Sequence, residues 1–149
     1  MKPEDYMIGP VLMGGLVRET EGDLVKVHLH GRLGVLTVPK KVIRGDIPLE
    51  PGCEMQFYFS YLWVVDEPPD YDAAPMTEEE ELFPCLVGGS LTEVNDTAVK
   101  LTLDQNLGTI AVPRRWIFTD VPLKEGLLAA CYLSGMKIIG KRDIPQEQI

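Results

Sequence analysis

The feature that most constrains this sequence is an internal repeat. The phrase LGVLTVPKKVI at 33–43 returns as LGTIAVPRRWI at 107–117. At the offset of 74 that these phrases set, 14–65 aligns without a gap on 88–139, and 17 of the 52 pairs are identical. Chance matching would give about three. The chain therefore consists of two copies of one unit of about 50–60 residues, which is near the lower limit for a self-sufficient core.

Each copy alternates apolar and polar residues with the period of two that is typical of half-buried strands. Val25, Val27 and Leu29 show this pattern clearly. Pro39 and Pro113 end the third strand of each copy, because proline cannot donate to the ladder. We predict strands over 13–20, 24–30 and 33–38 and one long last strand over 54–65, with the same pattern 74 residues later.

Four or five short strands in so few residues can bury a core only by closing into a small barrel. We therefore predict an all-β fold made of two tandem small β-barrels. An SH3-like barrel is preferred to an OB-like barrel, because an OB unit has a helix between its third and fourth strands and the repeat leaves no room for one.

An acidic, proline-containing linker separates the two copies. The stretch DEPPDYDAAPMTEEEELF has eight acidic residues, three prolines and no base, and it carries nearly all of the net charge of −9. We predict a first barrel with an N-terminal extension at 1–65, an extended and solvated linker at 66–83, and a second barrel with a C-terminal tail at 84–149. The linker is either a spacer or a polyanion that competes with an anionic ligand for a basic face of the barrels.

Composition and cysteine content indicate a cytoplasmic protein. Apolar residues make up 45% of the chain and charged residues 25%, as in soluble globular proteins. The N-terminus MKPEDYMIGP lacks the apolar core of a signal peptide, and no apolar run approaches the length of a membrane span. Cys53, Cys85 and Cys131 align with apolar residues of the other copy, so we expect them in the core.

The predicted last strand has two faces that behave differently between the copies. Tyr58 and Ser60 recur in the second copy, which indicates the core side. Tyr61 and Trp63, on the other face, are replaced there by glycine and lysine. Because a core position seldom exchanges tryptophan for lysine, Tyr61 and Trp63 are candidate binding residues in an exposed aromatic patch. The alternative, which we favour, is that this patch packs on the other copy.

Each copy places two cations directly after its repeated proline. They are Lys40 and Lys41 in the first copy and Arg114 and Arg115 in the second. Positive potential is shared, but the bidentate geometry of arginine is not. The cations either keep the barrel rim soluble or bind phosphate while Trp116 stacks on a base, as in single-strand binders. Neither copy has the excess of basic charge that strong nucleic-acid binders show.

The sequence has no pattern that indicates an enzyme. His28 and His30 on one strand would suit a metal only if a third ligand converged on them. No GxSxG, HExxH, P-loop or paired CxxC occurs, and neither GG pair precedes the helix that a dinucleotide site requires. We predict no catalytic residue, no metal and no cofactor.

The repeat unit resembles a group of small β-barrel proteins from clostridia and their relatives. The likeness is carried by GDLVKVHLHGRLGVLTVPKKVI and LEPGCEMQFYFSYLWVV, where the group has a V.V.L.GRLG.L.VP stretch followed by G.E..F..SY. This resemblance implies a barrel of SH3 or KOW type and implies no activity. More distantly, the strand order and the L.PG turn are similar to the molybdate-binding Mop or TOBE domains, but the serine and lysine pattern of those anion sites is absent here.

These observations lead to one preferred function and two alternatives. We predict a non-enzymatic interaction module, regulatory or accessory, that binds a protein partner or a second copy of itself and no membrane. The first alternative is an RNA-binding protein of KOW-like character, and the second is small-anion binding like that of Mop or TOBE domains. An exposed aromatic strand would support protein binding, and convergence of all four cations on one face would support RNA binding.

Overall fold

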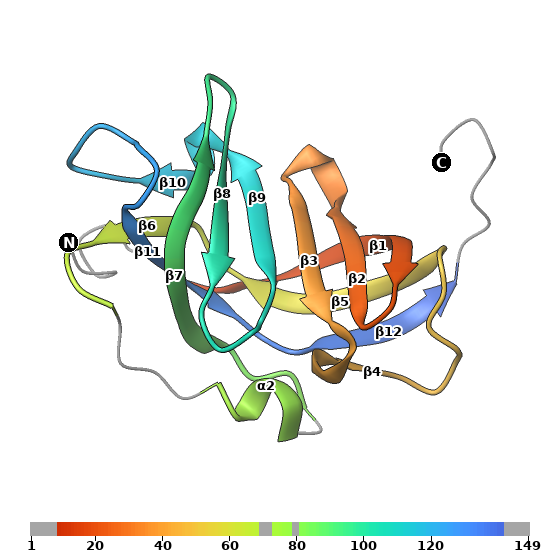
Figure 1. Ribbon diagram of the computed structural model, residues 1–149. Helices are drawn as coiled ribbons and strands as arrows, with labels where there is room; N and C mark the ends of the chain where they lie inside the picture. The colour runs from red at the N-terminus through yellow and green to blue at the C-terminus, as the bar shows by residue number, and fades with distance from the viewer. Residues whose placement is uncertain (1–8, 69–72, 79–80, 142–149) are drawn as a thin grey trace.

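The computed structural model describes residues 9–68, 73–78 and 81–141, which form an all-β protein with one short α-helix (Figure 1). The first copy of the repeat forms β1 (Val11–Glu21), β2 (Leu24–Leu29), β3 (Val35–Pro39), β4 (Ile43–Arg44), β5 (Cys53–Phe59) and β6 (Leu62–Val65). The second copy forms β7 (Cys85–Val94), β8 (Ala98–Leu103), β9 (Thr109–Pro113), β10 (Ile117–Phe118), β11 (Leu128–Leu133) and β12 (Met136–Lys141). Three 3-10 turns are η1 (His30–Arg32), η2 (Lys40–Val42) and η3 (Arg114–Trp116), and the helix is α2 (Pro75–Glu78).

The first three strands lie within two residues of their predicted bounds. In β2, Val25, Val27 and Leu29 are buried and Lys26 is exposed, as the alternation predicts. Pro39 ends β3, and the chain turns directly into η2. The elements β2, β3, η2 and β4 recur 74 residues later as β8, β9, η3 and β10, so the two copies share their local structure.

The last strand of each copy leaves its own copy and joins the other (Figure 1). Strand β6 pairs with β11 and β10 of the second copy, and β12 pairs with β5 and β4 of the first. All twelve strands form one sheet in the order β10-β6-β11-β7-β8-β9-β3-β2-β1-β5-β12-β4. The sheet curls into two lobes (Figure 1): the first lobe contains β1 to β5 with β12, and the second lobe contains β7 to β11 with β6. The predicted boundaries at 1–65 and 84–149 therefore separate sequence repeats, while the lobes in space exchange one strand each.

The segments that join β5 to β6 and β11 to β12 cross at Ser60 and Ser134, which are both buried. The amide of Tyr58 donates to the hydroxyl oxygen of Ser134, and the amide of Tyr132 donates to that of Ser60, both at 2.8 Å. The amides of Ser60 and Ser134 donate in turn to the carbonyl oxygens of Tyr132 and Tyr58 at 3.1 and 3.0 Å. The arrangement has pseudo-twofold symmetry. The prediction of one long last strand is wrong, because side-chain hydroxyls replace ladder bonds here and the strand is interrupted at 60–61 and at 134–135.

A second contact between the copies joins β3 to β9 in antiparallel register. Residues 35–37 pair with 109–111, which are their own equivalents in the repeat. Gly34 and Gly108 stand at the ends of this joint with φ of 132° and 101°. A Cβ atom at either position would overlap a backbone carbonyl oxygen of the facing strand. The repeated glycine of the two phrases is therefore needed where the copies touch.

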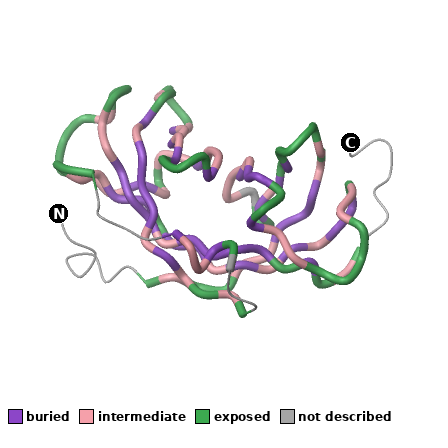
Figure 2. Tube along the Cα trace, turned by 60° about the horizontal axis from the view of Figure 1, so that its bottom comes forward, coloured by how far each residue is buried: buried purple, intermediate pink, exposed green. Residues whose placement is uncertain are grey.

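A single apolar core runs through both lobes, and buried residues follow the strands that cross between them (Figure 2). Phe57 and Phe59 have no exposed surface, and Trp63 is 2% exposed. The expectation that Trp63 belongs to an exposed patch is wrong: past the crossing it packs on the other copy, where it pairs with Ala130 of β11 and Phe118 of β10. All three cysteines are free and buried, which confirms their prediction as core residues.

Part of the linker is folded against the lobes, contrary to the prediction of an extended, solvated segment. Helix α2 begins at Pro75, and Met76 has no exposed surface. Ala73 is also buried. Nη2 of Arg44 donates to the carbonyl oxygen of Met76 at 2.6 Å. The segment 66–83 is acidic overall, but its apolar residues Ala73 and Met76 are buried against the lobes. Within the described ranges, no helix has the length and apolar content needed to cross a membrane.

Candidate functional site

The structure places the two cation pairs at opposite ends of the β3–β9 joint. Lys40 and Lys41 follow β3 in η2, and Arg114 and Arg115 follow β9 in η3. Because the two strands are antiparallel, they deliver these turns to opposite ends of the pair (Figure 1). Lys40, Lys41 and Arg115 are exposed. Arg114 is half-buried and donates to the carbonyl oxygen of Asn95 at 2.7 Å. The four cations are therefore divided between the two ends of this strand pair.

At the η3 end, an aromatic cluster forms that consists of Tyr61, Trp116 and Phe118. The ring centroids of Tyr61 and Trp116 are 3.9 Å apart, and those of Tyr61 and Phe118 are 5.1 Å apart. Tyr61 keeps 37% of its surface exposed, and the other two rings are half-buried. Tyr61 comes from the first copy and the other two from the second, and the parallel pairing of β6 with β10 brings them together. Of the predicted aromatic candidates, Tyr61 and Trp116 therefore share a site, and Trp63 lies in the core.

The opposite end of the molecule has different residues at the equivalent positions. At the offset of 74, Gly135 corresponds to Tyr61, Val42 to Trp116 and Arg44 to Phe118. Helix α2 packs at this end, and a Cβ at Gly135 would lie only 2.6 Å from the carbonyl oxygen of Met76. Val42 is fully buried, whereas Trp116 is only half-buried. Since α2 is the one α-helix in the described part of the chain, no described helix covers the aromatic end.

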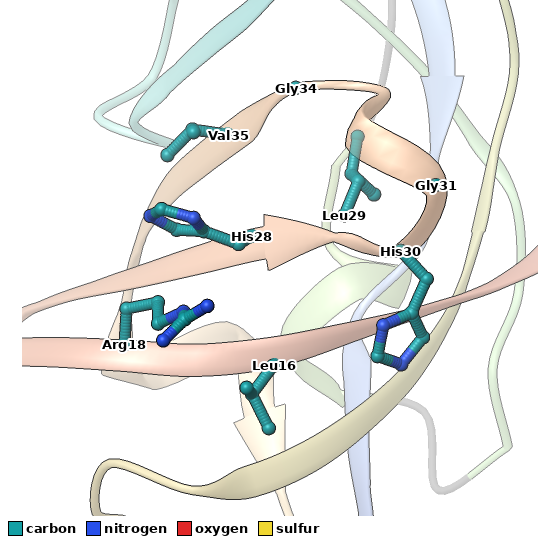
Figure 3. Close-up of a pocket in the computed structure, with 8 residues that line it drawn as sticks. All are labelled: Leu16, Arg18, His28, Leu29, His30, Gly31, Gly34 and Val35. Carbon is teal, nitrogen blue, oxygen red and sulfur yellow. The ribbon is translucent and has the colours of Figure 1, made fainter. Parts of the chain in front are cut away.

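A third feature is a pocket of about 430 Å³ in the first lobe, between β1, β2, η1 and the start of β3 (Figure 3). Arg18 and His28 project to the same side from neighbouring strands, and His30 points away from them (Figure 3). Burial, then the charges of Arg18 and Lys26, lower the pKa of His28 below its ordinary value of 6.5. The sequence did not point to Arg18, because a bulge between Val17 and Glu19 sets its position in β1.

The two histidines do not form a metal site in the arrangement that one strand face would give. His30 lies in η1 and not in β2, and its ring packs over Gly14. Among the residues that the structure describes, no group of three or more His, Cys, Asp or Glu side chains is placed to hold a metal ion. Asp104, the counterpart of His30, is exposed.

Comparisons with known proteins give little further information. No protein-family model matches the chain, and no curated protein matches it. Among solved structures, the chain is similar to the cytoplasmic molybdate-binding protein ModG with molybdate bound, at 17% sequence identity and a TM-score of 0.27. The alignment covers 85% of this chain and 92% of the ModG chain. At this TM-score the likeness carries no conclusion about ligands of this chain.

Proposed function

We propose that the chain is a non-enzymatic interaction module that binds a protein segment at the aromatic cluster. The observation that carries the proposal is the ring of Tyr61, which is 37% exposed and stacked on Trp116. Stacked, partly exposed aromatic rings provide a large contact area at a low cost in conformational entropy, and they are enriched at binding interfaces. A regulatory or accessory role fits a module of this kind.

The chemistry of the partner is suggested by the other end of the molecule. There, a short segment from the acidic linker buries Ala73 and Met76 beside η2, and Lys41 lines a pocket with Ala73, Ala74 and Thr77. The aromatic end carries the equivalent cations, with Arg115 exposed. Charge complementarity therefore favours a short acidic segment with one or two apolar side chains as the partner.

RNA binding is supported by one observation only, since Arg114 and Arg115 directly precede Trp116 at one end of the molecule. The division of the four cations between opposite ends counts against a continuous nucleic-acid track. Small-anion binding in the manner of Mop or TOBE domains is the third reading, and the weak likeness to ModG does not raise it above the others.

The proposal is tested with a fluorescent peptide, DYDAAPMTEEEELF, which copies residues 70–83 of the chain. Fluorescence anisotropy is measured for wild type, Tyr61→Ala, Arg115→Glu and Lys41→Glu. The last variant is the matched control, because it changes the equivalent cation at the end that α2 already covers. We expect saturable binding that Tyr61→Ala and Arg115→Glu weaken and Lys41→Glu does not. Absence of binding, or loss in Lys41→Glu alone, would contradict the proposal.

The RNA alternative has a separate test. Labelled single-stranded RNA is titrated at two salt concentrations against wild type and against a variant with alanine at Lys40, Lys41, Arg114 and Arg115. Salt-sensitive binding that the variant loses would place RNA first, because it would report counterion release at these cations. We expect no binding, even at low salt.

A further inference from the structure

The Arg18–His28 pocket is a second candidate site, distinct from the aromatic cluster. Arg18 and His28 lie next to each other in it, Val35 lies beside His28, and Leu16 points away from both polar side chains (Figure 3). Backbone of the η1 turn closes one side, at Gly31. Val35 is opposite His28 in the β2–β3 ladder, so these two side chains are on one face of the sheet.

The second lobe shows that the barrel does not require these polar side chains. The equivalents of Arg18, His28 and His30 are Thr92, Thr102 and Asp104. The hydroxyl oxygens of Thr92 and Thr102 are 2.9 Å apart and share a hydrogen bond across the ladder. Thr92 and Thr102 therefore form a hydrogen bond with each other at the place where the first lobe has the guanidinium of Arg18 and the imidazole of His28. The positive charge of the first lobe is a local addition to a scaffold that folds without it.

The two side chains have complementary capacities for binding an oxyanion. A guanidinium carries five N–H donors in a planar fork, so Arg18 can keep contacts within the protein and still donate to a ligand. The half-buried imidazole of His28 provides a further N–H donor beside it. Two carboxylates border the region: Glu19 is opposite Lys26, and Glu54 is opposite Leu16.

The size of the pocket favours a ligand with an organic part. A volume of about 430 Å³ is in the range of small-molecule sites, about 300–1,000 Å³. A free tetrahedral anion would leave the apolar surface of Val35 without a contact.

We propose that this pocket binds a small organic monophosphate, whose phosphate group lies between Arg18 and His28 and whose organic part contacts Val35. The site goes beyond the proposed protein-binding function, because it is built on the first copy alone and uses none of the residues of the aromatic cluster.

The experiment titrates phenyl phosphate, inorganic phosphate and phenol into the full chain and follows heat and the ring signals of His28 by NMR. The test variant, Arg18→Thr with His28→Thr, copies the pair that already folds in the second lobe. A second variant, Arg18→Lys, keeps the charge but removes the fork. Thr92→Ala, in the equivalent place of the other lobe, is the control.

We expect phenyl phosphate to bind more tightly than inorganic phosphate and phenol not to bind. The double variant should bind phenyl phosphate with an affinity at least about tenfold lower than that of wild type, as expected for loss of a charge-assisted hydrogen bond. Arg18→Lys should have an intermediate affinity, and the control should match wild type. Equal affinity of wild type and double variant, or no shift of the His28 signals on saturation, would overturn the proposal. Equal affinity for phenyl phosphate and inorganic phosphate would contradict the claim that the pocket contacts the organic group of its ligand.

Discussion

Replacing Gly108 with alanine should destabilise the protein by about 2–5 kcal/mol. The residue has φ 101°, where an L side chain costs about 1–2 kcal/mol. A Cβ there would also overlap the carbonyl oxygen of Thr37 across the β3–β9 joint. Relieving such an overlap adds about 1–3 kcal/mol. The joint would have to separate, because the overlapping atom belongs to the backbone and cannot rotate away.

Gly126 provides the matched control for this change. It has a similar φ of 94°, but a Cβ at this position would meet no atom within 4 Å. Gly126→Ala should therefore cost only the backbone strain, about 1–2 kcal/mol. Gly34→Ala, on the other side of the joint, should behave like Gly108→Ala.

The assay is urea unfolding followed by tryptophan fluorescence. With a slope of about 1–3 kcal/mol per molar urea, the extra cost at the joint should lower the midpoint of Gly108→Ala by about 1 M relative to Gly126→Ala. Equal midpoints for the two variants would refute the reasoning, since they would mean that the copies do not approach closely at β3 and β9.

Four further outcomes are expected. Ser134→Ala removes the acceptor of the partly buried Tyr58 amide at the crossing and should lower the free energy of unfolding by about 1–3 kcal/mol; an unchanged urea midpoint would contradict this. Met76→Asp should release the buried part of the linker and speed its cleavage by a protease, whereas an unchanged cleavage rate would mean that Met76 does not anchor it. Burial raises the pKa of the Cys131 thiol, so it should react with a thiol reagent only after unfolding. By NMR, the pKa of His28 should lie below 6.5 and rise in Arg18→Thr. Because His28 of the unfolded chain binds a proton at a higher pH than His28 of the folded chain, the free energy of unfolding should fall as the pH falls through 6.5.

Local structure was predictable from the sequence because it depends on alternation and on a few special residues. The strands that contain Val25, Val27 and Leu29 follow from the period of two, and Pro39 fixes where β3 ends. The two-copy organisation follows from identity at a constant offset. Each of these signals is carried by residues that are near one another or that repeat.

The exchange of the last strands could not be predicted in the same way. A strand that pairs with its own copy and one that pairs with the other copy have the same alternation, so period alone does not distinguish them. The comparison of Trp63 with Lys137 led to the wrong prediction that Trp63 is exposed, for a related reason. The two residues are equivalent in the repeat, but Trp63 packs beside Ala130 in the core while Lys137 is exposed.

The candidate sites were predicted only in part. Tyr61, Trp116 and Arg115 were identified, and the structure brings the two rings together. Arg18 was missed, because a bulge displaces it from the simple alternation of β1. Met76 was missed because it stands in a segment whose charge predicts solvation.

The strand exchange gives the two copies a freedom that separate subunits would not have. If two identical chains exchanged their last strands in this way, a homodimer would form, and every substitution would appear at both symmetry-related places. Here the two copies are on one chain, so each place can change alone. A glycine at 135 accommodates the linker helix, while a tyrosine at 61 builds an aromatic surface at the other end. Covalent joining has made a symmetric scaffold into one whose two ends can carry different residues and different surfaces.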